Sequence, residues 1–454
     1  MLAAALAAAA FLAPSGSTSA PATTRAVVGF RSNADLARAL SSFPGARIVK
    51  RLPHMKTVEV ELPGQASDLQ GRSGIAFVHR PLARTAKVEP ALAATLRSGL
   101  PYEWQYVATQ ANQVPEDVLR AASTIKIAVV DTGADVTQPD LASKAPETWD
   151  VVHRRTNVAD KDGHGTFVSG LAAGSVTNGE GIAGFGGDAQ LLMIKAVGAN
   201  GSFSDVDEAA AIVYAVDHGA KIVNLSLGGI GTSPLEQRAI RYAASHDVLL
   251  VAAAGNEYED GNPIEYPAAA LQPPGSNGQG GAGLSVGAST MTGRRASFSN
   301  TGSHISLAAP GERVFGALAA SSSRAWWPRS TLPGSQAGLY GWASGTSFST
   351  PEVAGAAALV WAANPALTAQ QVAAILKTTA SGGGLWNPRL GYGVIDAAAA
   401  VARARGETVA PRARWLRVHR VNSRGLRPRE RGRLRPLRFA VHRAARASQR
   451  ARRS

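Results

Sequence analysis

Three side chains far apart in the sequence could together form an activated nucleophile. Asp131 comes directly after an apolar run, His164 stands between two glycines, and Ser347 ends the segment Ser-Gly-Thr-Ser. In a serine nucleophile, an imidazole accepts the hydroxyl proton and a carboxylate orients the imidazole. These residue types therefore indicate acyl transfer, provided that the fold brings them together.

Each of these residues also has a structural interpretation when it is taken alone. An aspartate after a strand often satisfies its own backbone in a turn, and a lone histidine is more often structural. A serine ahead of a helix often caps it. Capping is the weaker interpretation of Ser347, because its segment offers four other hydroxyl residues, Ser344, Thr346, Ser349 and Thr350.

Two further features would stabilise negative charge beside Ser347. Pro351 suits the first turn of a helix that continues to Asn364, so Ser347 is expected just ahead of a helix N-terminus. The N–H groups and the dipole at such an end favour developing negative charge. Asn256 follows an apolar strand, and its carboxamide can donate hydrogen bonds to an oxyanion, although a turn asparagine is the usual alternative.

Short apolar strands alternate with amphipathic helices through the region that holds these residues. The pattern predicts a helix over residues 205–218 and strands over residues 125–130, 190–197, 221–227 and 248–254. Near-continuous apolar strands separated by helices indicate an α/β fold with a mostly parallel sheet covered on both faces. Active sites of such sheets lie at the carboxyl ends of the strands, which is where the candidate residues should be found.

Over residues 102–402 the chain resembles the subtilisin-like serine proteases, or subtilases. Asp131-Thr-Gly, His164-Gly-Thr and Gly-Thr-Ser347 match that family's three signatures in their order along the chain, and Asn256 matches its oxyanion asparagine. The resemblance implies a three-layer subtilisin-like fold with a mostly parallel sheet. It also implies a serine endopeptidase that works through an acyl-enzyme and requires no cofactor for catalysis.

The resemblance further implies where substrate and calcium bind. Substrate would contact the small-residue segments Ser226-Leu227-Gly228 and Ala254-Gly255, which suggest an open pocket that tolerates apolar side chains. A structural calcium site is implied at Asp140 and Asn178. Calcium prefers six to eight oxygen ligands, and besides these two side chains the sequence supplies only neighbouring carbonyl groups.

The sequence departs from the family pattern in two places. Phe167 stands where the family commonly has a second histidine, although the position of His164 is unaffected. Between residues 316 and 344 the chain is longer than in compact members and carries Trp326, Trp327 and Tyr340. Long loops in compact domains often bind ligands, so this insertion either shapes a subsite or is a surface loop.

The sequence divides into five regions. We expect an export signal in residues 1–25, an α+β domain resembling the family's inhibitor-type propeptide in residues 26–84, a linker with the maturation site in residues 85–100, the peptidase domain in residues 101–402, and an Arg-rich disordered tail in residues 403–454. The protein would then be secreted as a monomeric, self-inhibited zymogen. Its partners would be protein or peptide substrates and its own propeptide, and no segment is expected to span a membrane.

Positive charge is concentrated in the tail. The formal net charge is +15, and residues 403–454 hold 18 arginines and two acids, so the rest of the 454-residue chain is nearly neutral. Nucleic-acid binding is therefore not expected of the body. The alternative function is an inactive subtilase-fold protein whose tail binds nucleic acid or another anionic surface. The absence of cysteine excludes disulfides, thiolate chemistry and cysteine metal sites.

Overall fold

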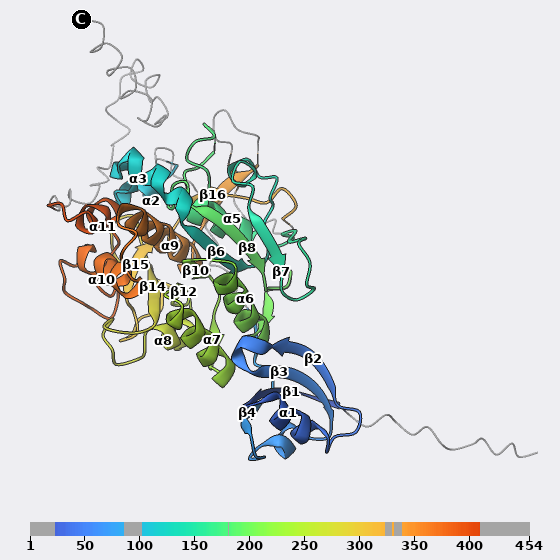
Figure 1. The fold of residues 1–454 in the computed structure, drawn as a ribbon. Helices are drawn as coiled ribbons and strands as arrows, with labels where there is room; N and C mark the ends of the chain where they lie inside the picture. The colour runs from blue at the N-terminus through green and yellow to red at the C-terminus, as the bar shows by residue number, and fades with distance from the viewer. Residues whose placement is uncertain (1–22, 86–101, 180, 323–328, 331–337, 409–454) are drawn as a thin grey trace, which may run out of the picture. The chain divides into compact units, whose positions relative to one another are not determined.

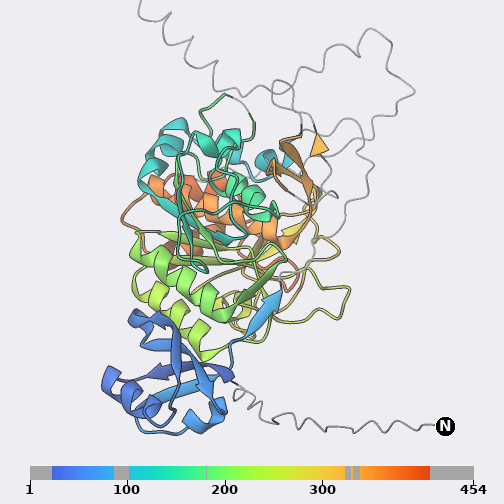
Figure 2. The same ribbon diagram turned by 90° about the vertical axis from the view of Figure 1, so that its right-hand side faces the viewer.

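A computed structural model describes residues 23–85, 102–179, 181–322, 329–330 and 338–408 (Figures 1 and 2). Most of the expected export signal, linker and tail, together with Trp326 and Trp327, lies outside the described residues. The chain forms two compact units, which adjoin in sequence at Pro81 and Leu82. The expected boundaries of the five regions stay predictions. No helix in the described part of the chain is both long and apolar enough to cross a bilayer.

The first unit is an antiparallel sheet in the order β2-β3-β1-β4, covered by one helix. Its elements are β1 (Thr23–Phe30), α1 (Asn33–Leu40), β2 (Arg47–Leu52), β3 (Thr57–Pro63) and β4 (Ile75–His79). Helix α1 begins after Ser32, whose side chain accepts a hydrogen bond from the Asp35 N–H group. Its Leu36 packs with Val28 and Val60 in a small core. Strand β2 was not predicted, because basic residues make up half of its sequence.

The second unit contains a seven-stranded sheet whose registered pairs are all parallel, in the order β15-β14-β12-β10-β6-β8-β7. The strands are β6 (Lys126–Asp131), β7 (Glu147–Asp150), β8 (Gln190–Lys195), β10 (Ile222–Leu225), β12 (Leu249–Ala253), β14 (Gly283–Ser289) and β15 (Leu307–Pro310). The four strands that the sequence predicted are among them. The expected α/β fold with a mostly parallel sheet is confirmed.

Helices cover both faces of this sheet, which gives three layers (Figures 1 and 2). Helices α5 (His164–Ala173) and α9 (Thr346–Ala363) pack on each other and on one face, while α6 (Asp205–Asp217) and α7 (Pro234–Ser245) pack on the other. Smaller helices complete the layers: α2 (Trp104–Ala108), α3 (Glu116–Ala121), α4 (Pro139–Ala142), α8 (Ala268–Leu271), α10 (Ala369–Thr379) and α11 (Ala397–Ala404).

Short strands complete the second unit. They are β5 (Ala83–Thr85), which pairs with β9 (Ser202–Ser204), β11 (Gly229–Ile230), which pairs with β13 (Glu265–Tyr266), and β18 (Tyr340–Ala343), which pairs with both β16 (Val314–Ala317) and β17 (Arg329–Ser330). Tyr340 is fully buried beside Phe315 and Trp104. The ring of Tyr340 therefore belongs to the core, and the choice between a subsite and a surface loop for the rest of the insertion stays open.

Helix α9 is the central helix of the core. It is apolar nearly all round, and small residues such as Gly355 let it approach its neighbours closely. A Cβ atom at Gly355 would lie 2.6 Å from the backbone nitrogen of Gly186. The helix begins at Thr346, so the expectation that Ser347 precedes it is wrong. Ser347 lies in the first turn, and Pro351 lies inside the helix.

One acidic residue of α9 is buried without compensation. Glu352 is fully buried, and neither of its carboxylate oxygens has a hydrogen-bond partner among the described residues. Burial raises the pKa of Glu352 well above its ordinary value. At a pH between the ordinary pKa and this raised pKa, Glu352 keeps its proton in the folded chain and releases it in the unfolded chain. The free energy of unfolding therefore falls as the pH rises through this range.

We expect Glu352→Gln to stabilise the second unit more strongly at pH 8 than at pH 5. The amide keeps the shape of the protonated acid, so the gain should grow by up to about 1.4 kcal/mol per pH unit. The measurement is thermal unfolding in a Ser347→Ala background, which prevents self-digestion. Glu116→Gln, at an exposed position of α3, is the matched control and should show no such trend. A Glu352→Gln gain that does not change with pH would contradict the assignment.

Candidate active site

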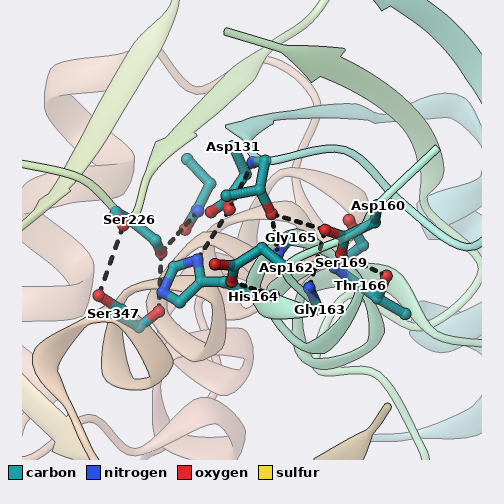
Figure 3. Close-up of polar contacts among 12 residues, drawn as sticks. Asp131, Asp160, Asp162, Gly163, His164, Gly165, Thr166, Ser169, Ser226 and Ser347 are labelled. Carbon is teal, nitrogen blue, oxygen red and sulfur yellow. Dashed lines mark hydrogen bonds and ion pairs between the residues drawn. The ribbon is translucent and has the colours of Figure 1, made fainter. Parts of the chain in front are cut away.

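The end of β6 and the start of α5 bring Asp131 and His164 together. His164 Nδ1 lies 2.7 Å from Asp131 Oδ1, which also accepts the Thr132 N–H group at 2.7 Å (Figure 3). Because the carboxylate accepts, Nδ1 is assigned as the protonated nitrogen, and Nε2 is then the acceptor of the neutral ring. Close approach requires Gly165, since a Cβ atom there would lie 2.1 Å from the Gly133 carbonyl oxygen.

A second buried carboxylate, Asp160, fixes this arrangement. Its Oδ1 accepts Thr132 Oγ1 at 2.9 Å and the Gly163 N–H group at 2.8 Å, and its Oδ2 accepts Thr166 Oγ1 at 2.6 Å. Burial raises the pKa of Asp160, and these donors oppose the rise. Asp160 therefore joins the end of β6 to the first turn of α5. Asp160 was not predicted from the sequence, because an aspartate in a polar loop has no distinctive pattern.

Ser347 is held in the first turn of α9 by Ser226. Pro351 has no N–H group, so the Ser347 carbonyl lacks the intrahelical donor that the fourth following residue would normally supply. Ser226 Oγ donates to that carbonyl at 2.7 Å instead, and Asn224 Nδ2 donates to Ser226 Oγ at 2.9 Å. Ser347 Oγ lies 3.4 Å from the Ser226 carbonyl oxygen (Figure 3). The end of β10 therefore positions the candidate nucleophile.

The orientation of Asn256 follows from two donors on Thr346. The Thr346 N–H group donates to Asn256 Oδ1 at 2.8 Å, and Thr346 Oγ1 donates to the same oxygen at 3.0 Å. Only the carbonyl oxygen of an amide can accept a backbone N–H, so the NH₂ group must point the other way. Asn256 lines the same cleft as Ser347, which suits a donor to a substrate oxygen.

These residues line one cleft. Asp131, His164, Asn256 and Ser347 share it, and so do the expected substrate-binding residues Ser226, Leu227, Gly228 and Gly255. Ala253 lines the cleft where Ala254 was expected. Two acids that the sequence analysis did not select, Glu257 and Glu265, also line it. The cleft is therefore lined by acidic as well as apolar residues.

Phe167 is a core residue that supports the site. The centroid of its ring lies 4.7 Å from that of the Phe348 ring, and the centroid of the Phe348 ring lies 5.5 Å from that of the His164 ring. Phe167 is fully buried. The aromatic side chain at this position therefore packs behind the site, and it leaves the His164–Asp131 contact intact.

The expected calcium ligands lie together away from the cleft. Asn178 Nδ2 donates to Asp140 Oδ1 at 2.9 Å, and the Ile182 N–H group donates to Asp140 Oδ2 at 3.2 Å. Glu103, which was not predicted, accepts the Ala183 N–H group at 2.9 Å. Burial, together with the nearby charge of Asp140, raises the pKa of Glu103 to about 8. Calcium binding by Asp140 and Asn178 stays a prediction, because no group of three or more acids or histidines that could hold a metal occurs in the described part of the chain.

The comparisons with known proteins agree with this geometry. The model of the subtilase family, Peptidase S8, matches residues 122–393. Thermitase of Thermoactinomyces vulgaris is 37% identical over 260 residues, which cover 57% of this chain and 81% of thermitase. The thermophilic serine proteinase of Bacillus sp. (strain AK1) is 36% identical over 244 residues, and the match spans only about half of that protein, 54% of its length.

A solved structure shows the same fold. The crystal structure of fervidolysin from Fervidobacterium pennivorans, described as a keratinolytic enzyme related to subtilisin, superposes with a TM-score of 0.71 at 24% identity. The match covers 86% of this chain and 62% of fervidolysin. Members of the family need no cofactor for catalysis. The chain belongs to the subtilase family of serine endopeptidases.

Proposed function

We propose that this protein is a secreted endopeptidase, made as a self-inhibited zymogen, with Asp131, His164 and Ser347 as its catalytic triad. The observation that carries the proposal is the 2.7 Å contact between His164 Nδ1 and Asp131 Oδ1 in a cleft that Ser347 also lines. Its substrates are proteins or peptides. The triad gives an acyl-enzyme mechanism in two halves, acylation of the serine and hydrolysis of the ester.

In the first half, Ser347 Oγ attacks the scissile carbonyl carbon. Attack requires Oγ to leave its 3.4 Å contact with the Ser226 carbonyl and to turn towards the imidazole. His164 Nε2 takes the hydroxyl proton and gives it to the leaving amine. Asp131 holds the ring in the required tautomer and stabilises the imidazolium. In the second half, water takes the place of the amine and the same groups reverse their roles.

The developing oxyanion is stabilised by two kinds of donor. Asn256 supplies its amide NH₂ group, which the two Thr346 contacts point away from the helix. The backbone N–H group of Ser347 lies in the first turn of α9, where N–H groups have no partner within the helix. Both donors are fixed before substrate binds, so no reorganisation is needed during the reaction.

Two features support the zymogen and export parts of the proposal. Residues 82–85 add a strand to β9, which directly follows the cleft residue Gly201. A segment of the chain's own N-terminal part thus pairs with the strand that directly follows a cleft residue, as an inhibitory propeptide would. The apolar start of the sequence, followed by small residues, supports export.

We expect Asn256→Ala to lower kcat by about 10²- to 10³-fold with a smaller effect on KM, a magnitude established on a member of this family. Ser347→Ala should remove nearly all activity. The matched control is Asn364→Ala. Asn364 lies at the other end of the 18-residue α9, about 25 Å from Ser347, so this variant should keep wild-type turnover. Peptide hydrolysis by each variant is the measurement. Wild-type turnover by Asn256→Ala would show that the oxyanion assignment is wrong.

We also propose a structural calcium ion held by Asp140, Asn178 and Glu103. As a ligand, Asn178 would turn its carbonyl oxygen towards the ion in place of its NH₂ group. A bound cation would relieve the repulsion between the carboxylates of Asp140 and Glu103.

Excess EGTA should therefore lower the Tm of the Ser347→Ala chain by several degrees, and added calcium should restore it. Asp140→Asn should lose this response, whereas Asp117→Asn, an exposed acid on α3, should retain it. A Tm that EGTA leaves unchanged in the parent chain would argue against the site.

A further inference from the structure

Residues Leu82–Thr85 bind the second unit in an extended conformation. Strand β5 pairs antiparallel with β9, with Ala83 opposite Ser204 and Thr85 opposite Ser202. The pairing is extended by Leu82, whose N–H group donates to Asp205 Oδ1 at 2.9 Å and whose carbonyl accepts the Asp205 N–H group at 3.0 Å. An added strand of this kind gains affinity from its backbone and specificity from the pockets that take alternate side chains.

Arg84 fills such a pocket. Its Nη1 donates to Glu208 Oε2 at 2.7 Å, and its Nη2 donates to Glu236 Oε2 at 2.9 Å and to the Gly231 carbonyl at 2.7 Å. The side chain of Arg84 is 2% exposed, and those of the two glutamates are fully buried. We call Asp205, Glu208 and Glu236 the acidic pocket; they lie in the first turns of α6 and α7.

Burying the carboxylates of the acidic pocket without a cation would cost free energy. Burial and the negative charge of Glu236 together raise the pKa of Glu208 to about 8, although Arg84 opposes the rise. Burial lowers the pKa of Arg84, but the attraction of Glu208 and Glu236 outweighs it, so the arginine stays protonated. Removing one partner from a buried ion pair typically leaves an uncompensated charge. The pocket is therefore matched to a basic side chain.

Both flanks of the pocket lead to the cleft of Ser347. From Ala83 to Thr85 the strand runs along β9 towards Gly201, which lines the cleft. On the other flank, Gly231 follows β11, which itself follows the cleft residue Gly228. A polypeptide that occupied the acidic pocket in this direction would enter the cleft with its next residues.

Two more carboxylates lie where that polypeptide would reach the cleft. Glu257 and Glu265 both line it. They lie close to Gly255, because a Cβ atom there would be 2.9 Å from Glu265 Oε2 and 3.0 Å from Glu257 Oε2. Strand β13 carries Glu265 and pairs with β11, which fixes this acid beside Gly228. The cleft next to Ser347 is thus acidic as well.

We propose that this protease selects substrates with two basic side chains, one bound by Glu257 and Glu265 beside the scissile bond and one bound by the acidic pocket a few residues before it. The inference rests on the proposed function, because it assigns substrate preference to the cleft of Ser347. It also explains why an arginine of the chain's own N-terminal segment fills the acidic pocket. The recognised polypeptide is an extended one that pairs with β9.

A purely structural role for the same acids leads to a different expectation. Glu236 is part of a capping box, since it accepts the Ser233 N–H group while Ser233 Oγ accepts the Glu236 N–H group. A glutamine serves equally well in a capping box. If Glu236 only capped α7 and Arg84 only anchored its own segment, the charge of the pocket would have no effect on cleavage of added peptides.

The test compares four fluorogenic peptides on the activated wild-type chain. The sequence supplies the first peptide, Arg-Thr-Ala-Lys, which copies residues 84–87 and ends at the first basic residue after Arg84. The other three replace the arginine by glutamine, the lysine by leucine, or both. Each basic residue should raise kcat/KM by about 10- to 100-fold, the range for charge-assisted hydrogen bonds. Two further peptides move the arginine one residue closer to, or further from, the lysine.

Substitutions of the acids test which of them causes the preference for arginine and which causes the preference for lysine. Glu208→Gln with Glu236→Gln keeps the capping box and should remove the arginine preference alone. Glu265→Gln should remove the lysine preference alone. Glu116→Gln is the control for loss of an acid elsewhere and should change neither ratio. If a variant fails to fold, the wild-type peptide ratios still decide the proposal.

The outcomes separate this inference from the proposed function. Labelling of Ser347 by a fluorophosphonate, together with ratios within twofold for every peptide, would overturn the inference and leave the protease assignment intact. Failure of the wild-type chain both to be labelled and to cleave any peptide would overturn both. Preferences that survive all the glutamine substitutions would also overturn the inference, because other groups would then supply the selectivity.

Discussion

The missing N–H group of Pro351 sets the main local constraint on the site. It leaves the Ser347 carbonyl in need of a donor, and the hydroxyl of Ser226 supplies one at 2.7 Å. Because Ser226 follows β10, this contact ties the first turn of α9 to the carboxyl end of the sheet. The Asn256 side chain at the end of β12 adds a second tie through Thr346. The Ser347 region is therefore fixed between two neighbouring strands.

The contact between Asp131 and His164 depends on a different set of interactions. Asp131 and His164 lie on separate elements, and Asp160 connects them through hydrogen bonds to Thr132, Gly163 and Thr166. The glycine beside the histidine lets the two segments approach to a distance that a Cβ atom would prevent. Both halves thus rely on residues that take no direct part in the proposed chemistry.

Much of the fold and part of the site could be predicted from the sequence. Strands such as the one that contains Val129 and Val130 are easily predicted, because a strand that is buried on both faces must consist of nearly continuous apolar residues. The position of Ser347 relative to its helix was misjudged, since a proline signals a helix start by default and its acceptance inside α9 depends on the distant Ser226. Asp160 and Glu265 were missed for a similar reason. Their roles come from contacts with residues far away in the sequence, and no local pattern distinguishes them from ordinary surface acids.

The central claim is that Ser347 cuts peptide bonds, including the one that frees the protease from its own N-terminal segment. The most direct test expresses residues 26–454 as wild type and as Ser347→Ala, and follows intact mass and casein cleavage together. The wild-type chain should lose a segment ending between residues 85 and 100 and digest casein, while Ser347→Ala should stay whole and inactive. A Ser347→Ala chain that processed itself and digested casein would show that Ser347 is not the nucleophile, and a folded wild-type chain that did neither would show that the chain is not a self-processing protease.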